Sequence, residues 1–509
     1  MNRTKNSVRN IFFTIAGAMV TMLLQLINRR VFIHYLSSDY LGLNGLFSNI
    51  LSMLSLSEMG VGTAMIYALY KPVADNDTEK IKSLMQLYKK FYTIIGGFIL
   101  VAGTVLTPFL HIFIKEMPDI AYIQVYYIMF VIDSGLSYFY TYKRSLIICN
   151  QQHYLSSLSM MLSNVVTRVA QLLLLIFTHN YFLFLLAQIV VSRLENVVIS
   201  KIADKKYPYL KEKNIVPLDA DSRKDIKKNI FAMLSHKIGT VIVYGTDNLI
   251  ISKILGLTVL GIYSNYVLLT TSVNGLIGKV FDAITASVGN LVVQKDKEQT
   301  EKIFNDIFFA NYWIYNFAAV CFFCLTQPFV KLWVGEEMML SDSVVWVIVI
   351  VFYLEGMRKT ALIFRDATGV FWNDRYKSLI ESFINLVCSI PLTFALGVFG
   401  VKLGTLISLL ATSFWVEGYV LYKHFFKKSV KGYLLKQAGY FGLTACMCVG
   451  VDFLCRLIAT GSVVSFVGQC ALCVIVPNAL MLALFGRTEA FAYFYNIVKG
   501  ILKKERTTK

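Results

Sequence analysis

The residues of this sequence with the greatest chemical potential are basic side chains embedded in long apolar stretches. Lys237, Lys279 and Arg168 each lie deep in such a stretch. Ionisable groups at membrane depth are costly and mark functional sites by default, and basic groups there could bind an anion. Further basic residues lie at the ends of apolar stretches. The complete set of candidate anion-binding residues is Lys237, Lys279, Arg168, Arg29, Arg30, Arg144 and Arg358.

Each of the deep cations also has a purely structural interpretation. Lys279 lies three residues before Asp282, on the same helical face, so the two could neutralise each other. Lys237 is near enough to the end of its stretch to extend its ammonium group to the interface. Arg168 could pair with a carboxylate such as Asp133. A salt bridge and an anion site therefore both remain open.

The basic residues at the stretch ends have their own structural alternative. Arg144 and Arg358, with the neighbouring Lys143 and Lys359, would anchor helix ends at the membrane surface. Plain interfacial anchoring is likewise the alternative for Arg29 and Arg30.

Carboxylates within apolar stretches could couple transport to an ion. A buried carboxylate has a raised pKa and needs a cation, so each could bind H⁺ or Na⁺. Pairing with an intramembrane base is the alternative. The candidates are Glu58, Asp133, Asp247, Asp282 and Glu355.

Two C-x-x-C pairs, Cys321/Cys324 and Cys470/Cys473, resemble metal or redox motifs. Both lie inside apolar runs without a nearby His. The sequence predicts thiols packed in the membrane rather than a metal site.

Composition defines the elements that must position these residues. Of 509 residues, 56% are hydrophobic and only 16% are charged, against a usual charged share of roughly 25%. A water-soluble fold could not bury that much apolar surface. The chain must cross a membrane many times.

Apolar runs long enough to cross a bilayer core, which takes roughly 20 residues, recur along the whole chain. The predicted spans cover residues 10–33, 43–70, 91–114, 121–142, 158–178, 181–200, 230–254, 259–292, 304–330, 343–364, 378–399, 401–421, 437–458 and 462–485. Very short turns after residues 178, 254, 399 and 458 predict helical hairpins. The predicted fold is an all-α integral membrane protein with about 14 transmembrane helices.

The distribution of positive charge predicts the orientation. The net charge of +18 would indicate nucleic acid for a soluble protein, but here Lys and Arg gather in alternate loops. Because cytoplasmic loops carry the excess of Lys and Arg, both termini are expected in the cytoplasm. No nucleic-acid partner is expected.

A weak internal repeat predicts the domains. Shifting residues 10–51 by 219 aligns Asn10-Ile11-Phe12 with Asn229-Ile230-Phe231, and Leu41-Gly42 with Leu260-Gly261. A second similarity between the two halves pairs Lys143-Arg144-Ser145 with Arg358-Lys359-Thr360. Parallel repeats are a transporter arrangement. The predicted domains are a six-helix bundle (1–200), a basic cytoplasmic linker (201–229), a second six-helix bundle (230–423), and two additional helices with a basic tail (424–509).

The segment from Leu255 to Tyr263 is similar to the L-G-x4-G-x-Y turn of the Wzx-type polysaccharide flippases, a branch of the MATE-like (MOP) superfamily. The first copy, Leu36 to Asn44, departs from that turn at Ser37 and Asn44. Ser57 to Gly62 resembles the family's acidic-apolar-Gly-apolar-Gly stretch. The resemblance covers nearly the whole chain in order and topology.

The resemblance implies movement of a polyprenyl-diphosphate-linked oligosaccharide from the cytoplasmic to the outer leaflet of a bacterial cell membrane. It also implies alternating access between the bundles, with Lys237 and Lys279 as diphosphate ligands. No cofactor is expected beyond H⁺, Na⁺ or the membrane potential. Expected partners are the lipid-linked oligosaccharide, membrane lipids and other membrane proteins of polysaccharide assembly.

The sequence bears on two other classes of protein. A multidrug exporter of the same superfamily would bind organic cations and should favour acidic residues at depth. An enzyme is disfavoured because the chain lacks G-x-x-x-x-G-K-[ST], H-E-x-x-H and G-x-S-x-G motifs. The basic residues at depth favour an anionic substrate.

Overall fold

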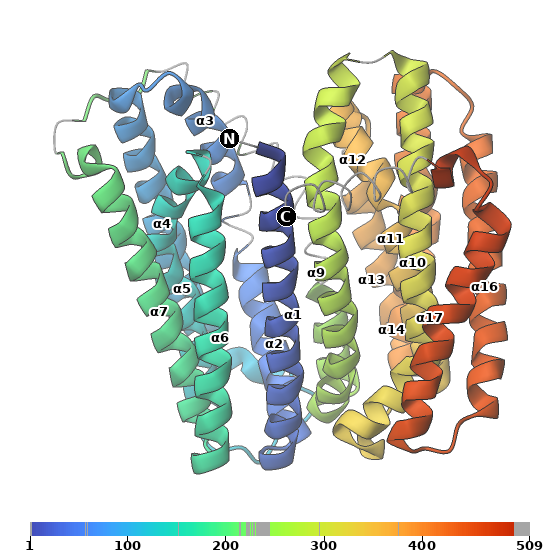
Figure 1. Ribbon diagram of the computed structural model, residues 1–509. Coiled ribbons are helices and arrows are strands. Elements are labelled where there is room, and N and C mark those ends of the chain that lie inside the picture. The colour runs from blue at the N-terminus through green and yellow to red at the C-terminus, as the bar shows by residue number, and fades with distance from the viewer. Residues whose placement is uncertain are drawn as a thin grey trace. The chain divides into compact units, whose positions relative to one another are not determined.

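The computed structural model describes residues 3–492 apart from 56, 57, 59, 151, 213, 214, 220–223, 225, 227–229, 231–244, 295 and 375. These residues form helices and connecting turns, without a β-strand among them. The all-α prediction is therefore confirmed. Figure 1 shows the helices in chain order.

The first half of the chain contributes seven α-helices. They are α1 (Arg3–Tyr35), α2 (Ser38–Leu54), α3 (Val61–Ala74), α4 (Thr78–Leu106), α5 (Ile123–Cys149), α6 (His153–Thr178) and α7 (Tyr181–Lys206). Short 3₁₀ segments follow α4 (Thr107–Ile112) and α7 (Pro208–Lys211). Residues 245–254 are also helical.

The second half contributes the remaining helices. They are α9 (Leu257–Gln294), α10 (Lys297–Val334), α11 (Asp342–Met357), α12 (Lys359–Thr368), α13 (Lys377–Leu396), α14 (Val398–Ala411), α15 (Ser413–Val420), α16 (Lys431–Leu457) and α17 (Val463–Phe485). A π-helical turn, Leu421–Phe426, follows α15, and 3₁₀ segments cover Glu336–Met338 and Val370–Asp374.

Polar caps and glycines set where the helices turn. Asn180 caps α7 by accepting from the amides of Phe182 and Leu183, as expected of Asn at this position. Gly397, at φ 62°, separates α13 from α14, a conformation that favours glycine. The short turns predicted after residues 178, 254 and 458 join successive helices as expected, whereas the turn predicted after residue 399 lies at Gly397, inside the predicted span 378–399.

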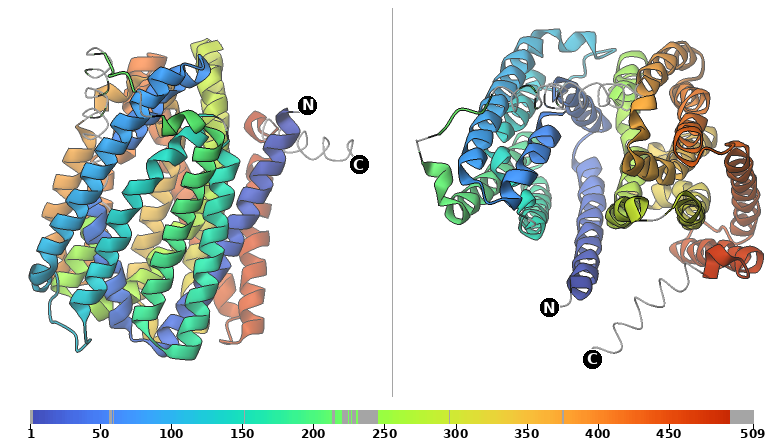
Figure 2. Two further views of the ribbon diagram at one scale, coloured as in Figure 1. Left: turned by 90° about the vertical axis from the view of Figure 1, so that its left-hand side faces the viewer. Right: turned by 90° about the horizontal axis from the view of Figure 1, so that it is seen from above.

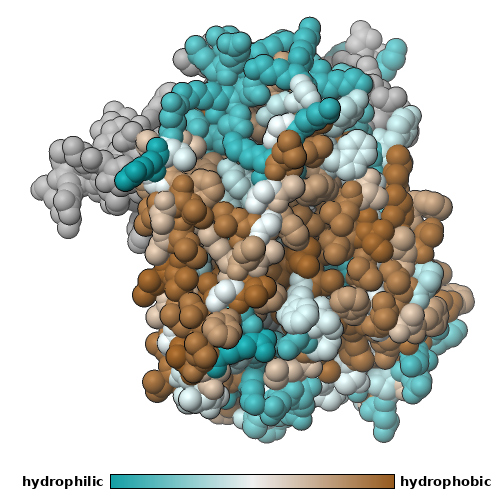
Figure 3. Space-filling view, turned by 90° about the vertical axis from the view of Figure 1, so that its right-hand side faces the viewer, coloured by the Kyte–Doolittle hydropathy of each residue, from teal (hydrophilic) through white to brown (hydrophobic). Residues whose placement is uncertain are grey.

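Eight described stretches are long and apolar enough to cross a membrane. On the face shown in Figure 3, hydrophobic side chains form a broad band between two hydrophilic ends. Apolar residues of α16 and α17 such as Val449, Phe453 and Val464 are exposed, as lipid-facing residues should be. The chain is a multi-pass membrane protein, and the count of fourteen spans stays a prediction.

The second predicted span is interrupted. Helix α2 ends at Leu54 and α3 begins at Val61, with Gly60 between them at φ 121°. The break leaves Glu58 in a turn rather than in a continuous helix. Discontinuous spans of this kind are a feature of transporters.

Residues 12–264 form one compact unit. Within it α4 packs against α5, α5 against α7, and α6 against α7. Gly96 and Gly135 let α4 and α5 approach closely, because a Cβ on either would meet the other helix. Figure 2 shows these helices side by side along one direction.

The two copies of the repeat meet inside this first unit. A Cβ on Gly42 would strike the backbone carbonyl of Leu257, and one on Gly261 would strike that of Ser38. These pairs are reciprocal under the shift of 219 residues. Thr258 donates a 2.6 Å hydrogen bond to Asp39, its own counterpart in the other copy. Such self-complementary contacts are what a two-fold relation produces, so the repeat read from sequence is present locally in the structure.

The second compact unit comprises residues 1–11 and 265–509. Within it α10 packs against α11, α16 and α17, while α13 and α14 form a closely packed hairpin. The division between units falls inside α9, whereas the sequence predicts a boundary in the linker 201–229. The predicted domain limits stay a prediction.

Candidate functional site

Two of the predicted anion-binding arginines come together inside the first unit. Arg29 of α1 and Arg168 of α6 lie close enough for their charges to repel. The Asn28 amide donates a 2.8 Å hydrogen bond to the backbone carbonyl of Arg168, which fixes α1 against α6. Both guanidinium groups are half-buried. The structure thus joins residues that are far apart in the sequence.

Arg168 lies deeper along its helix than Arg29 does. Helix α1 ends at Tyr35 and α6 is followed by His179, and the two rings stack at 4.3 Å. At 1.5 Å per residue, Arg29 lies about 9 Å and Arg168 about 15 Å along its helix from these ends. A bilayer core is about 30 Å thick, so Arg168 lies near the middle of a spanning helix.

The hydrogen bonds of the pair come from neutral groups. Arg29 donates to the Ser264 hydroxyl at 3.0 Å, and that hydroxyl donates to the Gly261 carbonyl at 2.7 Å. Arg168 donates to the Gln171 carbonyl oxygen at 3.1 Å. Neither guanidinium forms an ion pair with a carboxylate in the described part of the chain.

A chain of polar side chains leads from Arg168 to a third arginine. The Gln171 amide donates to Gln188 at 3.3 Å, and the Gln188 amide donates to Asp133 at 3.1 Å. Arg193 pairs with the other Asp133 oxygen at 2.8 Å. Asp133 is therefore the partner of Arg193, and it reaches Arg168 only through the two glutamines.

The charges of this chain do not cancel. Asp133 pairs with Arg193, and no described carboxylate pairs with Arg29 or Arg168, which leaves two positive charges among these residues. Arg193 also keeps its Nε and Nη1 groups buried without hydrogen-bond partners among the described residues. Uncompensated charge in low dielectric is costly. Such an arrangement is stabilised when a dianionic group supplies the missing negative charge.

The other predicted residues of the first unit lie differently. Arg30 is exposed on α1. Arg144 pairs with Glu195 at 2.5 Å, and Glu195 also accepts a 2.6 Å hydrogen bond from Ser159. The neighbouring Lys143 pairs with Asp204 in the same way. Arg144 is thus held by α7 through an ion pair, and both substrate binding and anchoring at the membrane surface stay predictions for it.

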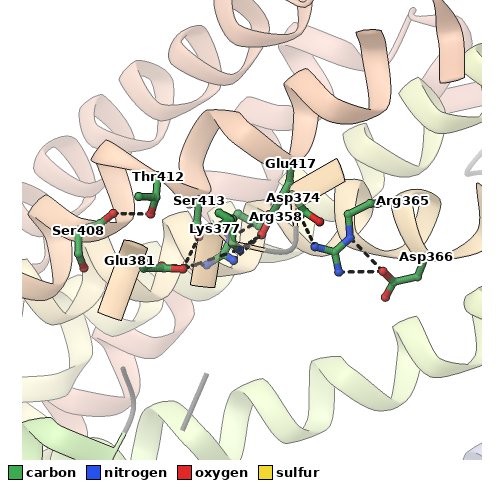
Figure 4. A network of polar contacts seen from close by, with 10 residues as sticks. All are labelled: Arg358, Arg365, Asp366, Asp374, Lys377, Glu381, Ser408, Thr412, Ser413 and Glu417. Atoms are coloured by element: carbon green, nitrogen blue, oxygen red, sulfur yellow. Dashed lines mark hydrogen bonds and ion pairs between the residues drawn. The ribbon is translucent and has the colours of Figure 1, made fainter. Parts of the chain in front are cut away.

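Arg358 belongs to a buried network in the second unit, shown in Figure 4. It makes two hydrogen bonds to Glu417, at 3.0 and 2.6 Å. Lys377 donates to the same carboxylate at 2.5 Å. Glu381 lies 3.7 Å from Lys377 and 3.9 Å from Arg358, and it accepts a 2.6 Å hydrogen bond from Ser413. All four charged residues are at least nine-tenths buried, and two cations balance two anions.

Of the two lysines predicted to bind the diphosphate, the structure describes only Lys279. Lys279 is exposed on α9 and makes no ion pair with a side chain that the structure describes. The side chain of Asp282, the proposed alternative partner, lies outside the described residues, and so does Lys237. Their roles stay predictions.

Glu58 heads a chain of hydroxyl groups. Its carboxylate accepts a 2.7 Å hydrogen bond from Tyr92, Tyr88 donates to Tyr92 at 3.1 Å, and Ser145 lies 3.1 Å from Tyr88. A Cβ at Gly62 would lie 2.8 Å from the Glu58 carboxylate and 2.9 Å from the Tyr92 hydroxyl. Glycine at this position is therefore required by the hydrogen-bond chain.

The remaining predicted carboxylates are dispersed. Asp247 is buried in the helix over residues 245–254. Glu355 lies half-buried on α11, near Tyr315. Their roles in ion coupling stay predictions.

Sequence reasoning missed the partners that decide these roles. They are Gln171, Gln188, Arg193, Glu195, Lys377, Glu381 and Glu417. A signal was available, because Glu195, Glu381 and Glu417 are carboxylates inside predicted spans. Which cation each one meets depends on helix packing, which spacing alone does not give.

The sequence and fold were compared with known proteins. A family model described as polysaccharide biosynthesis protein matches residues 7–286. The comparison with curated proteins gave no match. Among solved structures, the lipid II flippase MurJ in an inward closed conformation has a TM-score of 0.65 at 12% identity, covering 93% of this chain and 99% of that one.

Two transporters of the MATE family are also similar. A multidrug resistance MATE transporter of the MOP superfamily, inward-facing, has a TM-score of 0.58 at 15% identity, covering 79% of this chain and 95% of that one. The Vibrio cholerae MATE transporter VcmN has a TM-score of 0.58 at 14% identity, covering 84% and 99%. At such identities the likeness shows a shared fold.

Proposed function

Because the chain belongs to the polysaccharide biosynthesis protein family, we propose that it is a flippase for a lipid-linked oligosaccharide. Its substrate is an oligosaccharide joined by a diphosphate to a polyprenyl chain, moved from the cytoplasmic to the outer leaflet. The single observation that supports this proposal most is the pair Arg29 and Arg168. It offers positive charge at membrane depth without a carboxylate partner in the described chain.

The chemistry of the substrate matches such a pair. The polyprenyl tail can stay in lipid, whereas a charged diphosphate transferred to an apolar medium costs tens of kcal/mol by Born estimates. Guanidinium groups bind phosphate oxygens through paired, charge-assisted hydrogen bonds. Arg29 and Arg168 would bind the diphosphate, while the Gln171, Gln188 and Ser264 side chains offer neutral hydrogen-bonding groups nearby.

We propose alternating access as the mechanism, with the driving force supplied by charge. Moving negative charge out of a negative interior gains about 2.3 kcal/mol per charge per 100 mV. Coupling to H⁺ or Na⁺ would use a carboxylate such as Glu58, which accepts a hydrogen bond from the Tyr92 hydroxyl and forms no ion pair among the described residues. The protein would lie in a bacterial cell membrane with both termini in the cytoplasm, beside other membrane proteins of polysaccharide assembly. No enzymatic step is required.

The second candidate function is export of an organic cation. It is supported by the fold shared with the MATE transporters. A cation site needs carboxylates that are free of basic partners, yet Asp133 pairs with Arg193, and Glu417 with Arg358 and Lys377. The charge balance favours an anionic substrate.

The test is the leaflet accessibility of the lipid-linked oligosaccharide, probed from outside intact cells. The cells lack their own flippase and make several types of glycan. We expect outer-leaflet substrate only when the protein is present, and its loss in the double variant Arg29→Gln/Arg168→Gln. Lys237→Ala and Lys279→Ala test the lysines predicted from the sequence.

The matched control is Arg456→Gln, which removes an exposed arginine from the second unit. It should insert and support flipping like the native protein. If the native protein inserts normally but no glycan is flipped, the flippase proposal fails and cation efflux becomes the function to test. If flipping survives the double variant, the function stands without the proposed arginine site.

A further inference from the structure

Seven of the nine cysteines lie on three neighbouring helices of the second unit. Two come from α10, three from α16 and two from α17, and they are Cys321, Cys324, Cys446, Cys448, Cys455, Cys470 and Cys473. Helix α10 packs against both α16 and α17, and those two pack against each other. The flippase proposal makes no use of these thiols.

Three of the thiols meet at one point. The Sγ atoms of Cys324, Cys455 and Cys473 all lie within 4.8 Å of one another, and Cys455 and Cys473 are 3.9 Å apart. Their exposed fractions are 4%, 2% and 0%. A metal–thiolate bond of about 2.3 Å, the zinc value, would separate two sulfurs of a trigonal site by about 4.0 Å. The observed spacing is close to that of a bound metal.

Each sulfur comes from a different helix, and the surrounding contacts fix it. The Gln469 amide donates a 3.2 Å hydrogen bond to the carbonyl of Cys455, which ties α17 to α16. The Cys324 thiol faces the Cys448 carbonyl at 3.9 Å. The Cys455 thiol faces the Gln469 carbonyl at 3.9 Å. Both are weak hydrogen bonds donated by the thiol, so the described contacts leave the sulfur lone pairs available.

We propose that Cys324, Cys455 and Cys473 form a binding site for one monovalent copper ion. Soft thiolates select soft metals such as Cu(I) and Zn²⁺. Structural zinc sites are four-coordinate, and within the described chain no fourth His, Cys, Asp or Glu joins this group. Three sulfurs without a fourth ligand suit three-coordinate Cu(I).

The binding step balances without an oxidant or reductant. Cu⁺ displaces a proton from each of two thiols and is also coordinated by the third, which stays protonated. Two protons are released to solvent, and the site changes from neutral to a single negative charge. Metal affinity of this kind is pH-dependent because the ligands must lose protons.

A cavity lies at the same end of α16 and α17 and is lined by a residue that contacts Cys455. It has a volume of about 250 Å³, and Gln469, Ser465 and Gly461 of the α16–α17 end line it together with Gln327 and Lys331 of α10. Gln469 is one turn from Cys473 and contacts Cys455. A bound ion would cross-link α16 and α17 to α10, the central helix of the second unit.

The test uses the full-length protein, purified under reducing conditions in detergent. It is titrated with Cu(I) against bicinchoninate as a competing chelator, and bound copper is measured per chain. We expect about one Cu(I) per chain, with only sulfur neighbours by X-ray absorption. Cys473→Ser and Cys324→Ser should each weaken binding by at least about tenfold, because even loss of an outer-shell partner costs about 10–100-fold.

The matched control is Cys446→Ser, an exposed cysteine on the same helix as Cys455. It should bind copper like the native protein, and the elution profiles of all apo variants should agree. Copper binding that is absent, or equal in Cys473→Ser and native protein, would overturn the site. Zinc bound in preference to Cu(I), or a Cys455–Cys473 disulfide in protein purified without reductant, would also overturn it.

Discussion

The two units treat buried charge in opposite ways. In the first, Asp133 pairs with Arg193, whereas Arg29 and Arg168 have no carboxylate partner among the described residues, so positive charge remains. In the second, every charge of the network around Glu417 has a buried partner of opposite sign. A buried network without net charge can have a purely structural role. A buried charge without a partner has a desolvation cost that a bound ligand of opposite charge would offset. The first unit is therefore where an anion should bind.

The difference in charge balance is informative because the two halves of the chain are copies of one repeat. Arg144, just after the fourth predicted span, pairs with Glu195 on the sixth, and Arg358 on the tenth pairs with Glu417 on the twelfth. The alignment of the repeats places Arg144 opposite Lys359 and Lys143 opposite Arg358, so the two ion pairs start from adjacent positions of the repeat. The second half adds Lys377 to its pair, whereas the first half has Ser159 there.

The repeat also diverges at the arginine site itself. The 219-residue shift places Asn28-Arg29 opposite Asp247-Asn248. The first copy thus has the cation Arg29 at this position. The second copy has the neutral amide Asn248, which follows the carboxylate Asp247. A gene duplication followed by loss of symmetry at this position would give one anion site rather than two.

The largest expected effect is on the neutral network. Glu417→Gln would leave Arg358 and Lys377 buried beside a neutral amide. Breaking one partner of a buried ion pair costs roughly 3–5 kcal/mol, so we expect a much less stable protein, measured by thermal unfolding in detergent. Glu489→Gln, which removes an exposed carboxylate paired with Lys302, should leave the unfolding temperature unchanged. Equal stability of the two variants would refute the structural role.

The second prediction concerns the arginine pair. Arg168→Gln should lower flipping by about 10- to 100-fold, because a hydrogen bond to a charged group contributes roughly 1.5–3 kcal/mol. It should not destabilise the protein, since it relieves repulsion with Arg29. Flipping rates and unfolding temperatures of the same preparations check both halves of this statement. A variant that flips normally but unfolds early would make Arg168 structural, like Arg358.

The third prediction tests the repeat shared by the two halves of the chain. Gly42→Ala and Gly261→Ala each place a methyl group against the backbone of the other repeat. Overpacking of this kind costs about 1–3 kcal/mol, and the reciprocal geometry makes the two losses similar. Unfolding temperatures of both variants, with Gly439→Ala in open space as the control, measure this. A lower unfolding temperature for only one of the two glycine variants would argue against the two-fold contact.

The smallest effect is expected at an exposed ion pair. Arg456 and Asp452 lie four residues apart on α16, and Arg456 is 67% exposed. Exposed pairs contribute about 0–1 kcal/mol, so Arg456→Gln should change neither stability nor flipping appreciably. A large loss in either assay would mean that exposure is a poor guide to function in the second unit.

Much of the fold follows from the sequence, because apolar runs and polar caps act locally. The hairpin at Asn180 and the repeat relating Gly42 to Gly261 are examples. The break at Gly60 was missed, since an apolar run looks continuous whether or not its backbone is.

The candidate site was predicted only in part. Arg29 and Arg168 are identifiable by residue type and depth, yet their proximity depends on the packing of α1 against α6. Arg144 and Arg358 look alike in the sequence, and only Glu195 and Glu417 show that they are held in ion pairs. The Cys324 and Cys473 thiols meet because three helices pack together, which the C-x-x-C spacing does not reveal.

The most direct test of the central claim is binding of a polyprenyl diphosphate to the purified protein. Geranylgeranyl diphosphate, the corresponding alcohol and tetraphenylphosphonium would be titrated against native protein and the Arg29→Gln/Arg168→Gln variant. We predict that the diphosphate binds the native protein, that the alcohol and the cation bind far more weakly, and that the double variant loses diphosphate binding while keeping its unfolding temperature. Equal diphosphate binding by both proteins, or preferential binding of the cation, would contradict the account.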